Sequence, residues 1–191
     1  MDHNLSIERA LASADPGAEA SFFARYVTLK ERLLTKEYPM AMAGFPGGND
    51  HGPGHIVRVL GYLDQLVGPS PLQILSPYEL YLVMSAILYH DVGILRGRKD
   101  HAETSAVLLA EDENPYVFDA VDKDYIESAV VSHSSSADIR GRCARFEDEE
   151  VVRGHRVHPQ WIAALVRLAD ELDEDARRGS ADLEAKLVRH R

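Results

Sequence analysis

The segment SPYELYLVMSAILYHDVG, residues 76–93, is the most apolar stretch of the chain and indicates its fold class. Ser76, Pro77 and Glu79 form a capping box with proline at the first helical position, which predicts the start of a helix. The helix should run to about Asp91. Its apolar part is too short to cross a bilayer, which takes roughly 20 residues, so no membrane span is expected.

The rest of the chain also shows the periodicity of amphipathic helices. Helices are expected over residues 18–36, 55–67, 101–111, 123–134, 159–177 and 180–191. The polar residues 135–150 are expected to form a loop, and no β-strand pattern or internal repeat is apparent. We therefore predict an all-α protein, a single compact helical domain over residues 1–191 with about six or seven helices.

The composition is that of an ordinary globular protein. The 191 residues are 45% hydrophobic and 27% charged, and a chain of this length buries enough surface to fold without disulfides. Its one cysteine, Cys143, cannot form an internal disulfide, which fits a reducing compartment. The first residues lack the basic and apolar regions of a signal peptide. A cytoplasmic location is therefore expected.

The chain is strongly acidic, with 31 Asp and Glu residues against 21 Lys and Arg and a formal net charge of −10. This charge disfavours a protein whose main work is to bind nucleic acid. It leaves room for a small anionic substrate that is held by a local basic pocket or by a metal. Nine histidines are many for this length. They are either scattered or gathered into a site, and their positions decide between the two.

Three groups of histidine and aspartate lie on the apolar faces of predicted helices. His55 points toward the core, where it is either a hydrogen-bonded core residue or a metal ligand. His90 and Asp91 end the most apolar helix. A buried carboxylate there needs a partner charge, a metal or hydrogen bonds, whereas a helix end at the surface needs none. Asp170 lies at the edge of the apolar face of the helix over 159–177, with Asp173 nearer the centre of that face.

The order of these residues resembles the HD superfamily of metal-dependent phosphohydrolases, which is named for its His-Asp pair. The matching residues are His55 in GHIVRVLGYL, His90-Asp91 in AILYHDVG and Asp170 in VRLADELD. The resemblance covers about residues 50–178, which we take as the HD core. The N-terminal helix over 18–36 is expected to pack on this core.

The resemblance implies a metal centre held by these two histidines and two aspartates. Such ligands suit Mn, Fe, Co, Ni or Zn, with Mg as a further candidate. Because successive helical residues diverge by about 100°, His90 and Asp91 should meet the metal at the inward edge between them, and they are the predicted catalytic residues. In two-metal branches further histidines hold a second ion. His101 and His133 resemble these, with Ser134 in place of the usual second histidine, so one or two ions are expected and Asp91 would bridge them.

Candidates for substrate binding come from the loops near the His-Asp pair. They are His51, Arg96, Arg98, Lys99, Arg140 and Arg142. A guanidinium group can hold a phosphate through two hydrogen bonds. The alternative for these cations is ordinary solvated loop charge.

The resemblance implies hydrolysis of a phosphomonoester or phosphodiester by a metal-activated water, with a nucleotide as the expected substrate. Ile94 stands where two-metal cyclic-dinucleotide phosphodiesterases carry lysine, so the resemblance does not extend to that activity. Two alternatives remain open. One is an HD-type nuclease on single-stranded nucleic acid, which the acidic charge disfavours. The other is a catalytically inactive domain that senses a nucleotide, with a homo-oligomer or an attached effector domain as its partner.

Overall fold

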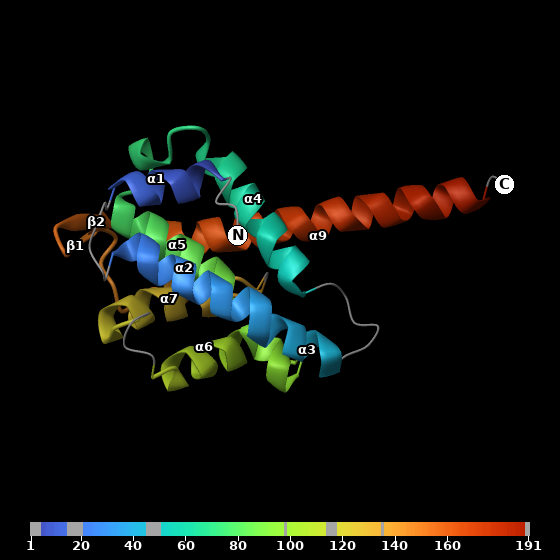
Figure 1. Cartoon of the computed structure of the whole chain (residues 1–191), viewed down its shortest axis with the longest axis horizontal. Coiled ribbons are helices and arrows are strands. Elements are labelled where there is room, and N and C mark those ends of the chain that lie inside the picture. Colours follow the sequence, from blue (N-terminus) through green and yellow to red (C-terminus); the bar gives the residue numbers. More distant parts are fainter. Residues whose placement is uncertain are drawn as a thin grey trace.

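The computed structural model describes residues 5–14, 21–44, 51–97, 99–113, 118–134 and 136–189, the part over 176–189 as backbone only. Helices make up most of this structure, and the described residues contain one small two-stranded sheet (Figure 1). The prediction of an all-α fold is therefore confirmed.

Helix α5 (Pro77–Tyr89) lies at the centre of the core, and all its residues from Tyr78 to Tyr89 are buried. The predicted capping box is present, because the Ser76 hydroxyl accepts from the Glu79 amide and the Glu79 carboxylate accepts from the Ser76 amide. The helices that pack against α5 include α2 (Phe22–Arg32), α4 (Pro53–Val67), α7 (Ala120–Ser132) and α9 (Pro159–Arg189).

Shorter elements connect and cover these helices. They are α1 (Ser6–Ala14), the π-helix η1 (Leu33–Glu37), α3 (Tyr38–Gly44), the 3-10 helices η2 (Pro71–Gln73) and η3 (Val92–Arg96), α6 (His101–Glu111) and α8 (Ile139–Arg142). The helix expected over 18–36 corresponds to α2 and η1, while residues 15–20 lie outside the described part of the chain. Helix α2 lies on α5, where the ring of Phe22 stacks on that of Tyr81 at 5.2 Å between centroids.

The short helix α8 lies within residues 135–150, which the sequence predicted to be a loop, and a hairpin follows it although no strand was expected. Strands β1 (Glu150–Val152) and β2 (His155–Val157) pair antiparallel, with Val152 opposite His155. The two residues between them, Arg153 and Gly154, both have positive φ angles, 55° and 79°, as tight hairpin turns of this length require. The prediction of no strand was wrong here because three-residue strands are too short to show alternation.

Helix α9 is one continuous helix where the sequence predicted two, over 159–177 and 180–191. Its first part is buried in the core through Ile162, Ala163, Val166 and Ala169, between α4 and α7. Its C-terminal part extends beyond the other helices (Figure 1). Among the described helices, α9 included, we find none with the length and apolar character needed to cross a membrane.

Candidate metal centre

The predicted His-Asp pair lies where α5 ends. His90 keeps helical backbone angles (φ −59°, ψ −34°), whereas Asp91 leaves them (φ −106°, ψ 3°) and precedes η3. The helix on which a divergence of about 100° was expected thus ends at Tyr89, just before the pair. Both side chains are buried, and His90 Nε2 lies 3.4 Å from Asp91 Oδ2.

Four side chains from α4, α9 and the end of α5 converge on one point. His55 Nε2 lies 3.2 Å from His90 Nε2 and 3.4 Å from Asp91 Oδ2. It also lies 3.2 Å from Asp170 Oδ1, which is 3.6 Å from His90 Nε2. In a tetrahedral site with bonds of about 2.1 Å, neighbouring ligand atoms are about 3.4 Å apart. These distances are those expected between ligands that share one metal ion, and His55, His90 and Asp170 form one of the groups that could hold it.

Hydrogen bonds on the far side of the imidazole rings turn the converging nitrogens into acceptors. His90 Nδ1 lies 2.7 Å from the carbonyl oxygen of Ile87, and His133 Nδ1 lies 2.6 Å from that of Val130. A carbonyl oxygen only accepts, so Nδ1 carries the proton and Nε2 of the neutral ring presents a lone pair. Lone pairs that face one another at about 3 Å repel unless a metal ion or a proton lies between them. The donor set therefore fits a metal ion.

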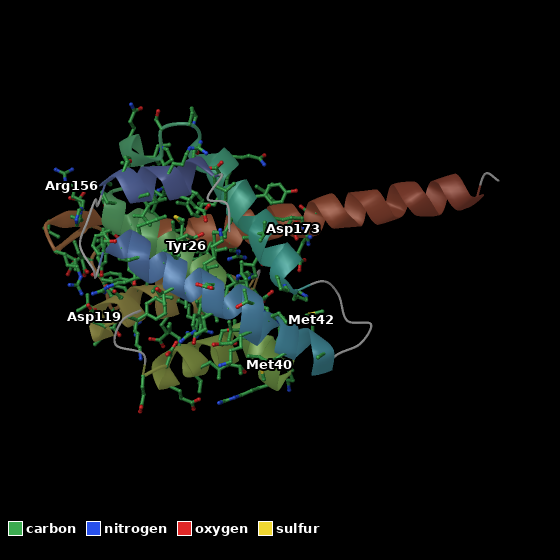
Figure 2. The ribbon with its side chains drawn as sticks, in the orientation of Figure 1. Tyr26, Met40, Met42, Asp119, Arg156 and Asp173 are labelled. Atoms are coloured by element: carbon green, nitrogen blue, oxygen red, sulfur yellow. The ribbon has the colours of Figure 1, made fainter. Side chains whose placement is uncertain are left out.

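Asp173 orients His55 and was not predicted as part of the site. Its Oδ2 accepts a hydrogen bond of 2.8 Å from His55 Nδ1, which leaves His55 Nε2 as the converging atom. Asp173 is buried and is itself held by Arg58, whose Nε donates to Oδ1 at 2.7 Å. It lies where α9 passes α4 (Figure 2). Carboxylates of this kind fix the tautomer of metal-bound histidines. The signal in the sequence was an acidic residue at the centre of an apolar helix face.

A second cluster shares Asp91 with the first. Asp91 Oδ1 lies 3.2 Å from His101 Nε2 and 3.8 Å from His133 Nε2, and the two histidine nitrogens are 3.0 Å apart. Each oxygen of Asp91 thus faces a different group of nitrogens. Ser134 lines the same cavity but carries no imidazole. All six predicted metal-ligating residues are therefore brought together, in two clusters that meet at Asp91. The groups that could hold an ion are His51, His55 and Asp91; His55, His90 and Asp170; and Asp91, His101 and His133, so His51 is a further candidate ligand.

The close packing of η3 against α6 places His101 beside Asp91. A Cβ atom on Gly93 would lie 2.1 Å from the carbonyl oxygen of His101, so this approach requires glycine. Ser105 fastens the two elements together. Its hydroxyl accepts from the Gly93 amide and donates to the His90 carbonyl oxygen, both at 2.7 Å. The second cluster thus depends on a contact between backbones as well as on its own side chains.

The two aspartates of the site are held in the charged state that suits cation binding, whereas a metal would have to displace the proton of His90. Burial raises the pKa of Asp91, but the charges and hydrogen bonds of the surrounding histidines outweigh it and hold this pKa well below the usual range. The pKa of Asp170 is lowered against burial for the same reason. Burial lowers the pKa of His90, yet the two aspartates outweigh it and raise it to about 9. Burial and the charge of His90 lower the pKa of His133 to about 4.

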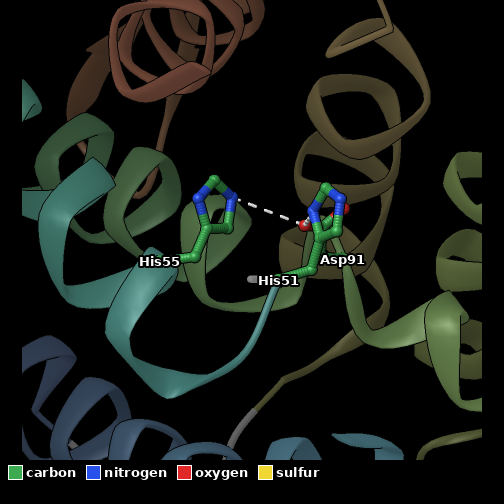
Figure 3. Close-up of side chains that lie close together, drawn as sticks. All are labelled: His51, His55 and Asp91. Atoms are coloured by element: carbon green, nitrogen blue, oxygen red, sulfur yellow. Dashed lines mark hydrogen bonds and ion pairs between the residues drawn. The ribbon is translucent and has the colours of Figure 1, made fainter. Parts of the chain in front are cut away.

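An open cavity of about 170 Å³ leads to these clusters. It is lined by His51, Asp91, His101, His133, Ser134, Asp170, Glu171 and Glu174. Figure 3 shows His51, just before α4, beside Asp91 and facing the same point as His55. His51 Nδ1 lies 2.8 Å from Asp91 Oδ2, which is the length of a hydrogen bond. His51, a candidate for substrate binding, is therefore placed at the mouth of the site.

The basic candidates for substrate binding do not line this cavity. Arg96 pairs with Glu111 at 2.7 Å, and Arg142 pairs with Glu103 at 2.9 Å. Lys99 and Arg140 are exposed. Arg98 lies outside the described residues. Among the described lining residues there is no lysine or arginine.

The comparison with protein families agrees with this geometry. The family model called HD-CE matches residues 38–190, and the chain belongs to this family of HD-type domains. The resemblance to the HD superfamily is thereby confirmed, and the histidine and aspartate clusters are compatible with HD metal binding. The comparisons with curated proteins and with solved structures found no match.

Proposed function

We propose that this protein is a metal-dependent phosphohydrolase that hydrolyses a phosphomonoester or phosphodiester, with a nucleotide as the expected substrate. The observation that carries the proposal is the convergence of His55, His90, Asp91 and Asp170, the first three of them buried, with ligand atoms 3.2 to 3.6 Å from those of His55 and His90, beside an open cavity. A purely structural cluster has no need of an opening to solvent.

His55, His90, Asp91 and Asp170 would hold the first ion. His101, His133 and the second oxygen of Asp91 would hold another, so that Asp91 bridges the two. When bound, such ions activate a water for attack on phosphorus and offset the negative charge that develops there. The nitrogen and oxygen ligands suit Mn, Fe, Co, Ni or Zn.

The protein's own residues set the orientation of this machinery. Asp173 and two backbone carbonyl groups hold the imidazoles of His55, His90 and His133 in one tautomer. His51 donates to Asp91 and keeps that carboxylate aimed between the clusters. Because these contacts orient the ligand atoms through the protein's own groups, the site would bind metal and substrate with little rearrangement.

The test is a metal analysis of the purified protein followed by a screen with phosphomonoesters and phosphodiesters, with Asp91→Ala as the control. We expect bound transition metal and hydrolysis by the wild type that the variant lacks. A metal-loaded wild type that hydrolyses no more than the variant would instead indicate a nucleotide-sensing domain. Salt-sensitive cleavage of single-stranded DNA or RNA would indicate the nuclease.

A further inference from the structure

Helix α5 ends beside the proposed metal centre, and the carbonyl groups of a last helical turn need donors other than the helix's own amides. Side chains supply several of them here. The carbonyl oxygen of Leu88 accepts from the Tyr38 hydroxyl at 2.9 Å, and that of His90 accepts from Ser105 at 2.7 Å. The carbonyl oxygen of Ile87 lies 2.7 Å from His90 Nδ1. Of these donors, Tyr38 has no place in the metal centre as described above.

Tyr38 reaches the end of α5 because of the π-helix η1. The amide of Tyr38 donates to the carbonyl oxygen of Leu33, five residues earlier instead of the four of an α-helix. The extra residue in this turn carries Tyr38 onto the buried face of Leu33, where Glu37 would otherwise lie. Pro39 favours the wider turn, since it has no amide hydrogen and its ring would clash with the carbonyl group of Thr35. Such turns are rare and are frequent at functional sites.

The Tyr38 side chain is buried in the core, beside the chain segment that carries the His-Asp pair. Burial raises the pKa of its hydroxyl well above the usual value and the charge of Asp91 raises it further, so the hydroxyl keeps its proton and donates. Helix α3, which begins at Tyr38, also packs on η3, the element that follows Asp91. Tyr38 thus holds the chain just before the pair, and α3 holds it just after.

The position of this hydrogen bond gives it a consequence for the metal centre. Leu88 directly precedes Tyr89, the last residue of α5, and the backbone leaves helical angles at Asp91. A shift of the last turn would therefore displace His90 and Asp91 together. Their ligand atoms lie 3.4 Å apart, and each lies within 3.4 Å of His55 Nε2. A displacement of more than about 0.5 Å would spoil such an arrangement.

We infer that Tyr38 is a positioning residue of the metal centre. Its hydroxyl fixes the Leu88 carbonyl group at the end of α5, and through that backbone it sets where His90 and Asp91 meet the metal. The π-turn of η1 is the device that brings the hydroxyl there. This inference rests on the metal centre of the proposed function and is independent of the substrate.

The experiment measures metal binding and ligand geometry, so it does not depend on turnover. The full chain is titrated with Co²⁺ in competition with a chelator of known affinity. The visible absorption of the bound Co²⁺ is recorded as well, because it reports the arrangement of the ligands.

Tyr38→Phe removes the hydroxyl and keeps the ring that packs in the core. We expect its affinity for Co²⁺ to fall by about tenfold, because partners that orient metal ligands contribute about 10- to 100-fold and Tyr38 acts through the backbone. The absorption spectrum of the bound Co²⁺ should change at the same time.

The matched control is Tyr26→Phe. Tyr26, labelled in Figure 2, is a fully buried tyrosine of α2 whose hydroxyl donates to Glu8 at 2.7 Å. It lies about 18 Å before Tyr38 along the same run of helix. Both variants lose one buried hydrogen bond, so their midpoints of urea unfolding should fall by similar amounts. The control should nevertheless keep the wild-type spectrum and an affinity for Co²⁺ within about twofold of the wild type.

The results separate this inference from the proposed function. If Tyr38→Phe keeps the affinity and the spectrum of the wild type, the inference is wrong while the metal site stands. If Tyr26→Phe loses as much affinity, a general loss of stability is responsible, and the inference is again wrong. A Tyr38→Phe chain that does not fold would show that the hydroxyl serves the whole fold, which contradicts a role specific to the metal centre. A wild type that takes up no Co²⁺ contradicts the proposed function and this inference with it.

Discussion

The two ends of α5 each lie beside a buried aspartate, and the two aspartates have opposite kinds of neighbours. Asp122 of α7, near the N-terminal end of α5, accepts hydrogen bonds from the hydroxyl groups of Tyr78 and Tyr81 at 2.7 and 3.2 Å. It also accepts from Arg25 at 3.0 Å. Its charge is therefore satisfied by donors that the protein itself provides. Figure 2 labels one residue from each region. Asp119, which precedes α7 and pairs with Arg25 at 3.8 Å, lies well apart from Asp173, which holds His55.

Asp91, at the C-terminal end of α5, faces nitrogens instead of hydroxyl and guanidinium groups. The Nε2 atoms of His55, His90, His101 and His133 all lie within 3.8 Å of its carboxylate. At least three of these rings carry their Nδ1 proton on the side away from it. The comparison teaches that burial of a carboxylate does not by itself indicate function. What indicates function is that its neighbours are imidazole nitrogens, which can give up a proton and bind a metal instead.

The largest effect is expected from replacing Asp91, at the end of α5 that is surrounded by imidazoles. Asp91→Ala removes the one residue that both clusters share, so we expect loss of bound metal and a fall in hydrolysis of about 10³-fold or more, because metal activation contributes several kcal/mol. The measurements are metal content and the initial rate on the substrate found by the screen. An Asp91→Ala protein that keeps its metal would remove the distinction between the two ends.

Replacing Asp122, at the end of α5 where hydroxyl and guanidinium groups donate to it, should change stability and leave metal binding unchanged. Asp122→Asn removes the charge that Arg25 and two phenols share, and we expect the free energy of unfolding to fall by about 2 to 3 kcal/mol. Urea unfolding measures this loss. Asp124→Asn, an exposed aspartate of the same helix, is the control and should change stability by less than about 0.5 kcal/mol. Reduced metal content in Asp122→Asn would show that the two ends are not independent.

A smaller effect, on metal affinity, is expected from a change beside the metal centre. Asp173→Asn keeps the shape of the side chain but weakens its hold on His55, and we expect metal affinity to fall by about 10- to 100-fold. Competition with a chelator of known affinity measures this change. Asp175→Asn, an exposed aspartate two residues farther along α9, is the control. Equal affinities in the two variants would mean that Asp173 serves packing alone.

The sequence was sufficient to predict the proposed metal ligands, but it was not sufficient to predict the residues that surround them. His55, His90, Asp91 and Asp170 could be chosen because their order and helical context resemble a known superfamily. The role of Asp173 could not, since the contact between His55 and Asp173 depends on how α4 and α9 cross. Likewise, the pairing of Arg96 with Glu111 and of Arg142 with Glu103 depends on tertiary placement, so these cations looked available for substrate.

The local errors have a similar cause. The end of α5 was placed at Asp91 because an apolar run shows where a helix passes but not the residue at which its backbone turns. The hairpin of β1 and β2 was missed because its strands have three residues each. By contrast, the capping box before α5 was predicted correctly, since all of its atoms come from one short segment.

The most direct test of the account is the metal content of the purified wild-type chain after equilibration with Mn²⁺ and removal of excess ions. The convergence of imidazole nitrogens on both oxygens of Asp91 predicts close to two ions per chain, and Asp122→Asn should hold the same number. A wild-type protein that holds no metal, while remaining folded by circular dichroism, would contradict the central claim that this end of α5 is built around a cation.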